Sequence, residues 1–403
     1  MIVLVINSGS SSIKFQVIRM DDRSRLCAGL LERIGLEDGT FTFEPDGREK
    51  LQSAAKISDH SQGIGLILQA IADPQHGVLS SVREIAAVGH RVVHGGETIR
   101  RAELVTPRVE AIIEECGKLA PLHNPANLTG IRAVRNLLPS VPQVGVFDTA
   151  FHATMPEESF LFALPYGCYQ EHGIRRFGFH GTSHRFVSRR AAEILGRDTR
   201  DFACVSCHMG NGVSIAAIRD GRSVDTSLGF GTMCGAPMGT RAGDVDPAAV
   251  LYMIDALGMS SQEVRRLLYY ESGLKGVSGL SSDMRDIVAA AGSGNRRAAL
   301  ALQVFAHGCR RHIASLATSL GGRLDALIFT AGIGEHSPES RRLICQGLEV
   351  LGIEIDDGRN AAIGVEATIS SSSSRVPVLV VPTNEELMIA IETEEAIGRR
   401  GCG

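Results

Sequence analysis

The feature that most constrains the fold is a strand–turn–strand pattern that occurs twice, about two hundred residues apart. Residues 2–6 form a continuous apolar run, residues 7–12 are small and polar, and residues 13–17 alternate apolar with polar side chains. The second copy has an apolar run at residues 202–207, a turn at 208–212 and a returning run at 213–218. Continuous or alternating apolar runs of this length are typical of strands. Equivalent units in two halves predict an internally duplicated fold.

A third turn follows an apolar strand expected at residues 325–330. Residues 331–335 read Ala-Gly-Ile-Gly-Glu, and we expect them to form a glycine turn. Ser337 and Pro338 follow shortly, and serine at the N-cap with proline at the first helical position is typical of a helix start. Helical stretches such as residues 299–320 separate the strands, so each half is expected to have an α/β architecture.

The composition excludes several classes of partner. The chain is 44% hydrophobic and 21% charged with a net charge of −4, so no bulk positive field attracts nucleic acid or an anionic membrane. The run at residues 2–6 has no basic region before it and is far shorter than a membrane span. The nine cysteines have no repeating spacing, and the Cys204-x-x-Cys207 pair is interpreted as core rather than as a zinc site. We expect a cytoplasmic protein that binds neither nucleic acid nor membrane.

The three turns indicate a phosphate ligand. Glycine lets the backbone approach an anion closely and direct its amides at it. One such turn is usually structural, whereas three directly after apolar strands favour phosphate binding. The sequence has no G-x-x-x-x-G-K-[ST] motif, no protein-kinase combination of glycine loop, strand lysine and H-R-D, and no third glycine at dinucleotide-binding spacing after Gly334. P-loop proteins, protein kinases and Rossmann proteins are therefore excluded.

Six short sequence blocks extend this picture. They are residues 7–14 (NSGSSSIK), 90–96 (HRVVHGG), 178–184 (GFHGTSH), 208–212 (HMGNG), 238–241 (MGTR) and 383–386 (TNEE). Together they resemble the motifs of the acetate kinase family along nearly the whole chain. The resemblance implies a duplicated two-domain ribonuclease H-like α/β fold, that of actin-like ATPases, with a cleft between the domains. It implies an N-terminal domain at residues 1–150, completed by a C-terminal helix at 385–403, and a nucleotide-binding domain at 151–384.

The same resemblance implies a transferase that moves the γ-phosphoryl group of ATP reversibly to acetate, giving acetyl phosphate and ADP. The catalytic positions it implies are Arg91, Asp148, His180 and Arg241. Phosphoryl transfer is mostly positioning and charge neutralisation, so convergent cations suit it. Asp148 follows an expected strand at residues 143–147, and a phospho-enzyme on this carboxylate is the alternative mechanism. Direct transfer is favoured because the acceptor already carries a nucleophilic oxygen.

The resemblance also assigns the nucleotide and metal positions. Asn7 and Glu385 are the implied ligands of Mg²⁺, with Mn²⁺ as the alternative ion; magnesium keeps much of its water and needs few protein oxygens. The implied ATP-binding positions are Lys14, His208, Met209, Gly210, Asn211, Gly212, Asp283, Met284, Arg285, Ala331, Gly332, Ile333, Gly334 and Glu335.

The acyl substrate is the least constrained part of this interpretation. The implied substrate positions are Arg91, Val93, Leu122, His123, Phe179 and Thr232. Valine at 93 makes a small slot that suits acetate, but a methylene is worth only about 1–3 kcal/mol in an apolar pocket. The segment 229–237 (GFGTMCGAP) departs from the family pattern, with Thr232 where relatives carry proline. Propionate kinase, or another short-chain acyl kinase, is therefore the nearest alternative.

Two further expectations depend on the resemblance alone. The family implies a homodimer and a link to acetyl-CoA biosynthesis.

The alternative function from a different class of protein is an actin-like, nucleotide-gated binding protein. Such a protein would keep the phosphate turns without needing paired arginines.

Overall fold

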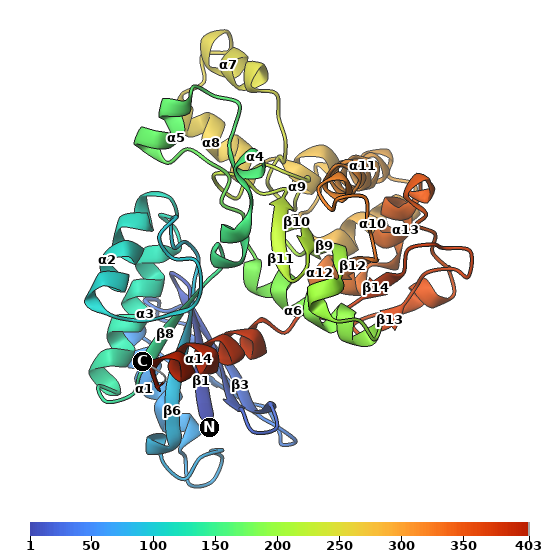
Figure 1. Cartoon of the computed structure of the whole chain (residues 1–403). Helices are drawn as coiled ribbons and strands as arrows, with labels where there is room; N and C mark the ends of the chain where they lie inside the picture. Colours follow the sequence, from blue (N-terminus) through green and yellow to red (C-terminus); the bar gives the residue numbers. More distant parts are fainter. Residues whose placement is uncertain (402–403) are drawn as a thin grey trace. The chain divides into compact units, whose positions relative to one another are not determined.

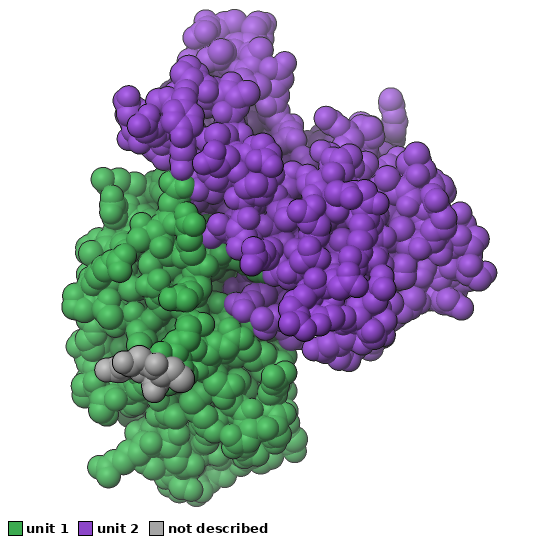
Figure 2. Space-filling view, in the orientation of Figure 1, with its two compact units in different colours: residues 1–151, 384–403 green, residues 152–383 purple. Residues whose placement is uncertain are grey.

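The structure is a computed structural model that describes residues 1–401, and the chain divides into two compact units (Figure 2). Unit 1 comprises Met1–Phe151 and Asn384–Gly403, and unit 2 comprises His152–Thr383. Residues 402–403, part of the C-terminal helix expected at 385–403, lie outside the described residues. Among the described residues no helix is long and apolar enough to span a membrane.

The core of unit 1 is a mixed sheet with the strand order β5-β4-β3-β2-β1-β6-β8-β7. β1 runs antiparallel to β2 and parallel to β6, which in turn runs parallel to β8. The strands are β1 (Ile2–Ser8), β2 (Ser12–Arg19), β3 (Ser24–Glu32), β4 (Thr40–Pro45), β5 (Leu51–Ala54), β6 (Ile85–Val92), β7 (Glu103–Leu104) and β8 (Gln143–Phe147).

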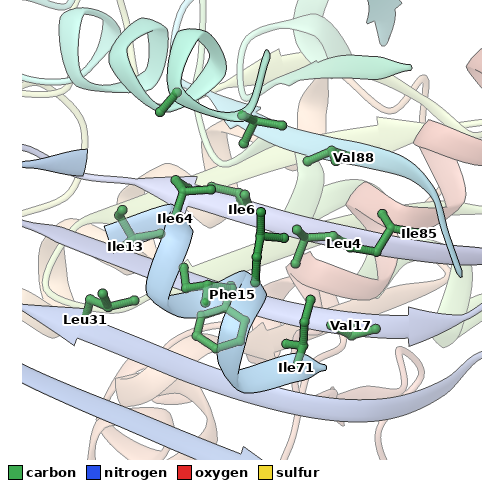
Figure 3. Packing of buried hydrophobic residues seen from close by; sticks show 14 of the residues in the cluster. Leu4, Ile6, Ile13, Phe15, Val17, Leu31, Ile64, Ile71, Ile85 and Val88 are labelled. Carbon is green, nitrogen blue, oxygen red and sulfur yellow. The ribbon is translucent and has the colours of Figure 1, made fainter. Parts of the chain in front are cut away.

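Helices cover both faces of this sheet. They are α1 (His60–Ile71), α2 (Pro107–Glu115), α3 (Asn124–Leu137) and the C-terminal α14 (Glu385–Gly401), which is red in Figure 1. Leu4 and Ile6 of β1 pack with Ile64 and Ile71 of α1 on one face (Figure 3). Val3 and Val5 point the other way, because side chains alternate along a strand, and pack against Ile389 of α14. The end of the chain therefore completes the core of the unit in which the chain begins.

Unit 2 contains a six-stranded sheet with the order β11-β10-β9-β12-β14-β13. Its strands are β9 (Ala203–Met209), β10 (Val213–Arg219), β11 (Arg222–Thr226), β12 (Ala326–Thr330), β13 (Ala367–Thr368) and β14 (Val378–Val380). Its helices are α4 (Glu157–Phe160), α5 (Tyr166–His172), α6 (Gly181–Ile194), α7 (Pro247–Asp255), α8 (Ser261–Tyr270), α9 (Gly273–Ser278), α10 (Met284–Gly292), α11 (Arg296–Thr318), α12 (Ala331–His336) and α13 (Pro338–Cys345). Taking both units together, short 3-10 helices lie at Val82–Glu84, Cys116–Lys118, Ala150–Thr154, Thr199–Asp201, Glu349–Leu351 and Arg359–Ala361.

The strand orders of the two sheets confirm the expected duplication. In unit 1 the five central strands follow the order β3-β2-β1-β6-β8, and in unit 2 they follow β11-β10-β9-β12-β14. Each set begins with an antiparallel three-strand meander and continues with two parallel strands. The equivalent strand–turn–strand units are β1–β2 and β9–β10, the two segments that the sequence pattern identified.

Two local expectations were wrong. Residues 331–335 form the first part of the helix α12 instead of an open glycine turn. Gly334 is packed there, since an added Cβ would lie 3.3 Å from the main-chain carbon of Phe329. His208 and Met209 belong to β9 and pair with Ser214 and Val213 of β10, so the turn is confined to residues 210–212. The helix start at Ser337 is confirmed, because its hydroxyl accepts a hydrogen bond from the Ser340 amide.

Candidate functional site

Unit 2 contains a pocket of about 830 Å³ that three segments line together. The first is the β9–β10 turn, the second is the start of α10, and the third runs from α12 into α13. The lining residues are Gly210, Asn211, Ser282, Asp283, Met284, Arg285, Val288, Ala289, Gly332, Ile333, His336, Ser337, Pro338 and Glu339. Three segments spread over residues 210–339 of the sequence therefore form one concave surface.

The local chemistry of each segment explains how the pocket is held. Asp283 caps α10 by accepting a hydrogen bond from the Arg285 amide at 2.8 Å. The Arg285 guanidinium also donates to this carboxylate and lowers the pKa of Asp283 to about 2. Val288 and Ala289 of α10 supply an apolar wall. An added Cβ on Gly332 would meet no heavy atom within 4 Å, so this glycine borders open space. The arrangement fits a flat apolar group with a polar tail, such as a nucleotide.

The turn at residues 210–212 is tight and is the point where two polar groups converge. The Gly210 amide donates to the Gly212 carbonyl at 3.0 Å. An added Cβ on Gly212 would lie 3.3 Å from Nη1 of Arg241 and 3.6 Å from Nε2 of His180. Asn211, between the two glycines, lines the pocket. A guanidinium and an imidazole ring therefore lie against the turn that borders the pocket.

Arg241 is held by its own loop. Its Nη1 donates to the Thr232 carbonyl oxygen at 3.1 Å and lies 3.6 Å from Sδ of Met238. Burial lowers the pKa of Arg241, but an arginine remains cationic at neutral pH. The contact with residue 232 is made by the main chain, so it does not depend on which side chain that position carries.

His180 is positioned by the start of α6. It is the N-cap residue and has a left-handed backbone, with φ 56° and ψ 27°, a conformation that is uncommon for a residue with a side chain. Nδ1 of the ring lies 2.8 Å from the Ser214 hydroxyl. The ring stacks on that of His208, with centroids 4.2 Å apart and planes 21° apart. Strained backbone of this kind concentrates at functional sites.

Unit 1 carries a second group of charged residues, the Arg91 cluster (Arg91, Asp148, Glu385, Glu386 and Lys14). Nε and Nη2 of Arg91 donate to the two carboxylate oxygens of Asp148 at 3.0 and 2.8 Å. Nη1 of Arg91 lies 3.7 Å from Oε2 of Glu385, and Lys14 forms an ion pair with Glu386. A bidentate arginine–carboxylate pair fixes the plane of the guanidinium.

The strand pattern brings these residues to one edge. Arg91 lies near the end of β6, and Asp148 directly follows the parallel strand β8, whose Phe147 pairs with Val92. Asn7 continues the row of Val3 and Val5, which faces α14, and it pairs with Lys14 across β1 and β2. Glu385 and Glu386 begin α14. The carboxyl ends of parallel strands and a helix start thus bring the cluster together.

The charges of the cluster shift the pKa values of its members. Burial alone would lower the pKa of Arg91, but the negative charges of Asp148 and Glu385 outweigh it and raise that pKa. Burial raises the pKa of Glu385; Asp148 and Glu386 add to this rise, and Arg91 and Lys14 oppose it. Three carboxylates share two cations here, so the cluster carries one more negative than positive group when all are ionised.

The expected substrate residues occupy varied environments. The Val93 amide donates to the Asn127 side-chain oxygen at 3.2 Å, which ties the segment after β6 to α3. His123 is the N-cap of α3, and the side chain of Leu122 is 60% exposed. Phe179 is buried beside His180.

The expected ATP-binding residues divide into two sets. Those that line the pocket are Gly210, Asn211, Asp283, Met284, Arg285, Gly332 and Ile333. Met209 is fully buried, and Glu335 accepts hydrogen bonds from the amides of Ala331 and Thr383. Lys14 belongs to the Arg91 cluster. The sequence analysis did not identify Val288 and Ala289 as pocket residues. It identified Ser337 and Pro338 only as a helix start, and these two residues also line the pocket.

Comparisons with known proteins agree with this geometry. The sequence matches the acetokinase family over residues 2–391. "Acetate kinase 2" of Clostridium perfringens is 50% identical over 397 residues, which cover 98% of this chain and 100% of that protein. The structure of Porphyromonas gingivalis acetate kinase superposes with a TM-score of 0.93 at 44% identity, covering 98% of this chain and 99% of that one. A propionate kinase of Francisella tularensis has a TM-score of 0.90 at 39% identity, covering the same shares. With matching motifs, strand order and full-length similarity, this chain belongs to the acetokinase family.

Proposed function

We propose that this chain is an acetate kinase, which transfers the γ-phosphoryl group of ATP to acetate and forms acetyl phosphate and ADP reversibly. The observation that carries the proposal is the convergence of Arg241 and His180 on the Gly212 turn, next to the pocket that Asn211 lines. A nucleotide in that pocket would direct its phosphates at these two groups. The family membership supplies the class of acceptor.

The residues of unit 2 would hold the nucleotide. Val288 and Ala289 offer the apolar wall for the base, and the glycines of the Gly210–Gly212 turn would let the phosphates approach the main chain closely. Arg241 would neutralise the transferring group, whose oxygens carry the charge during transfer, and His180 would orient it by a hydrogen bond. We propose that unit 2 is the nucleotide-binding domain. From the family resemblance we infer that Arg91 of unit 1 binds the acceptor.

The chemical step needs no general base. A carboxylate oxygen of acetate forms the new bond to the γ-phosphorus, and the bond from that phosphorus to the β–γ bridging oxygen breaks. The electron pair stays with ADP, and no proton moves. Arg91, fixed in plane by Asp148, would orient the acceptor carboxylate through its remaining donors.

The Arg91 cluster fits a magnesium ion. Glu385 is a carboxylate whose pKa burial raises, and Asn7 adds an amide oxygen on the face of the sheet that α14 covers. Carboxylate and amide oxygens are ligands that Mg²⁺ prefers, directly or through its waters, and Mn²⁺ accepts the same set. When bound, the ion would neutralise phosphate charge, and Glu385 and Asn7 would hold it.

The phospho-enzyme alternative is the weaker mechanism in this geometry. Both carboxylate oxygens of Asp148 accept hydrogen bonds from Arg91, which makes the group a poor nucleophile. Transfer from ATP made chiral at the γ-phosphorus distinguishes the two mechanisms. Direct transfer inverts the configuration, whereas two transfers through Asp148 retain it.

The preference for acetate over propionate rests on Val93 and on family relatives. Thr232, which stands where relatives carry proline, holds Arg241 through its main-chain carbonyl. The replacement is therefore expected to affect the binding of the acyl group more than phosphoryl transfer. Propionate kinase is the second candidate, because the solved structure of a propionate kinase has a similar fold.

The family resemblance also bears on the assembly, location and metabolic role of the protein. We infer a homodimer, which the exposed apolar side chains Leu251, Tyr252 and Leu257 around α7 support; sedimentation of the purified chain tests it. A cytoplasmic location and a role of acetyl phosphate in acetyl-CoA formation follow from the family alone.

Hydroxylamine trapping tests the proposed activity. Purified protein with ATP, Mg²⁺ and acetate is expected to form acetyl hydroxamate, and omission of ATP removes the signal. Arg91→Ala and Arg241→Ala are expected to reduce turnover by about a hundredfold or more, as loss of a preorganised charge contact does. Absence of hydroxamate with acetate, propionate and butyrate would favour the nucleotide-gated binding protein instead.

A further inference from the structure

Helix α6 presents three polar side chains on one face. His180 caps the helix, and Ser183 and His184 follow three and four residues later, a spacing that places side chains over one another on a helix. The facing strands carry matching polar groups. Ser206 and His208 are two residues apart in β9 and so share a face, and Ser214 of β10 pairs directly with His208.

These side chains join in a continuous series of hydrogen bonds, here called the Ser–His chain (Ser206, His184, Ser214 and His180). The Ser206 hydroxyl lies 3.0 Å from Nδ1 of His184. Nε2 of His184 lies 2.7 Å from the Ser214 hydroxyl, and that hydroxyl lies 2.8 Å from Nδ1 of His180. Ser206, His184 and Ser214 are fully buried, so the chain leads from the core to the ring beside the Gly212 turn.

A parallel row supports the neighbouring ring. The Thr383 and Ser183 hydroxyls are 2.9 Å apart, and the Ser183 hydroxyl lies 2.8 Å from Nδ1 of His208. His208 stacks on His180. Both rings are therefore held at Nδ1 by a serine. The Cε1–Nε2 edge of the His180 ring then lies beside Gly212, with these atoms 3.5 and 3.6 Å from the position of an added Cβ.

The hydrogen bonds of the Ser–His chain restrict which ring nitrogens can carry a proton. Burial keeps the pKa of His184 well below its usual value, with His152 and His208 lowering it further, so His184 is neutral and carries one N–H. Its ring can donate to only one of its two serines and must accept from the other. In one order Ser206 donates to His184, His184 donates to Ser214, and Ser214 donates to Nδ1 of His180. In that order a neutral His180 carries its proton on Nε2.

We propose that Ser214 and His184 are positioning residues that hold His180 with an N–H on Nε2, directed at the transferring phosphoryl group. An anion above Gly212 selects this order, because Nε2 then donates instead of facing the anion with a lone pair. His180 thus acts as a donor without having to carry a charge, while Arg241 supplies the positive charge. The reversed order leaves neutral His180 without an Nε2 proton and opposes the anion.

The catalytic effect of this inference rests on the proposed function, whereas the hydrogen bonds behind it do not. The charged and titratable groups around the chain are His152, with its ring 5.7 Å from that of His184, His208, at 6.2 Å from His184, and Arg241 beside the His180 edge. The three hydrogen bonds that run from Ser206 to His180 involve only Ser206, His184, Ser214 and His180. The tautomer of His180 can therefore be measured independently of any catalytic activity.

The first test is the nitrogen NMR spectrum of the wild-type protein with ¹⁵N-labelled histidine, with His180 assigned by His180→Gln. We expect neutral His180 to carry its proton on Nε2 in the presence of ATP and Mg²⁺. A proton on Nδ1 would overturn the inference. This measurement needs no change at Ser214, and it stands whether or not the protein forms acetyl phosphate.

The second test compares variants by kinetics. Ser214→Ala is expected to lower kcat about ten- to hundredfold, with KM for ATP and acetate changed less than about threefold, since the lost contact acts in the transition state. Ser214→Thr, which keeps the hydroxyl, should recover most of kcat. The control is Ser188→Ala in α6. It removes a different buried serine, whose hydroxyl donates to the Arg185 carbonyl, and should leave kcat unchanged. A folded Ser214→Ala with wild-type kcat and tautomer would refute the inference, whereas an inactive wild type would refute only the proposed function.

Discussion

The Arg91–Asp148 pair offers the sharpest test of how unit 1 contributes to activity. The change is Asp148→Asn, which keeps the shape of the side chain but replaces one acceptor oxygen with an amide nitrogen and removes the charge. Asp148 is almost fully buried and receives two donors of Arg91 at 3.0 and 2.8 Å. The amide can accept from only one of them and places a donor against the other.

The magnitude follows from the burial of the two partners. Removing one member of a buried pair costs about 3–5 kcal/mol, and a hydrogen bond to a charged group contributes about 1.5–3 kcal/mol. Arg91 is 21% exposed and lies 3.7 Å from Glu385, so part of its charge stays compensated. We therefore expect a loss of about 2–3 kcal/mol in the positioning of Arg91. Since each 1.36 kcal/mol is a factor of ten, kcat should fall about 30- to 150-fold.

The assay is steady-state acetyl phosphate formation, with circular dichroism to show that the variant is folded. The matched control is Glu366→Gln, because Arg190 also holds Glu366 through two donors, at 2.7 and 2.9 Å, but on an exposed surface. Exposed pairs contribute about 0–1 kcal/mol, so this control should keep wild-type kcat. A folded Asp148→Asn within threefold of wild-type kcat would refute the role given to the pair, as would an equal loss in the control.

Three further predictions concern the turn, the pocket and a buried histidine. Gly212→Ala places a methyl group 3.3 Å from Nη1 of Arg241, which must then shift, and should lower kcat at least about tenfold by misplacing this guanidinium; unchanged kcat would show that the position of Arg241 at this turn does not matter for transfer. Gly332→Val adds a side chain where an added Cβ meets nothing within 4 Å, so the KM for ATP should rise while urea unfolding stays the same, and an unchanged KM would remove α12 from the nucleotide site. Burial lowers the pKa of His90 to about 4, below the value of about 6.5 in the unfolded chain, so its stabilising contribution is present above pH 6.5 and is lost as the pH falls toward 4. Between pH 7 and pH 5 this amounts to about 2 kcal/mol, and His90→Gln should lose that part of the pH dependence of urea unfolding; an identical pH dependence in the variant would contradict it.

The parts of the fold that repeat a local pattern could be predicted from the sequence. The alternation in residues 13–17 and the continuous run in 2–6 gave β2 and β1, because period-2 burial is encoded residue by residue. Ser337 and Pro338 marked the start of α13 for the same local reason. The α12 segment was wrongly expected as a turn, since its two glycines signal a turn locally, whereas the close packing of Gly334 against Phe329 is tertiary.

The candidate site was predictable only where motifs named it. Gly210, Asn211 and Asp283 were expected from the family resemblance, and they line one pocket. Val288 and Ala289 carry no motif, because an apolar helix face has the same sequence whether it meets a core or a ligand. The Ser–His chain was missed because it depends on the register of β9 against β10 and on the face of α6, and neither is visible in one sequence. The helical spacing of His180, Ser183 and His184 was the signal that could have indicated it.

The measurement that tests the central claim most directly is a competition between two acceptors. Wild-type protein is incubated with ATP, Mg²⁺, hydroxylamine and equal concentrations of acetate and propionate, and the two hydroxamates are separated and quantified. The ratio of products equals the ratio of the kcat/KM values. We predict that both form and that acetyl hydroxamate predominates. Predominant propionyl hydroxamate would contradict acetate as the substrate, and formation of neither would contradict the acyl kinase activity itself.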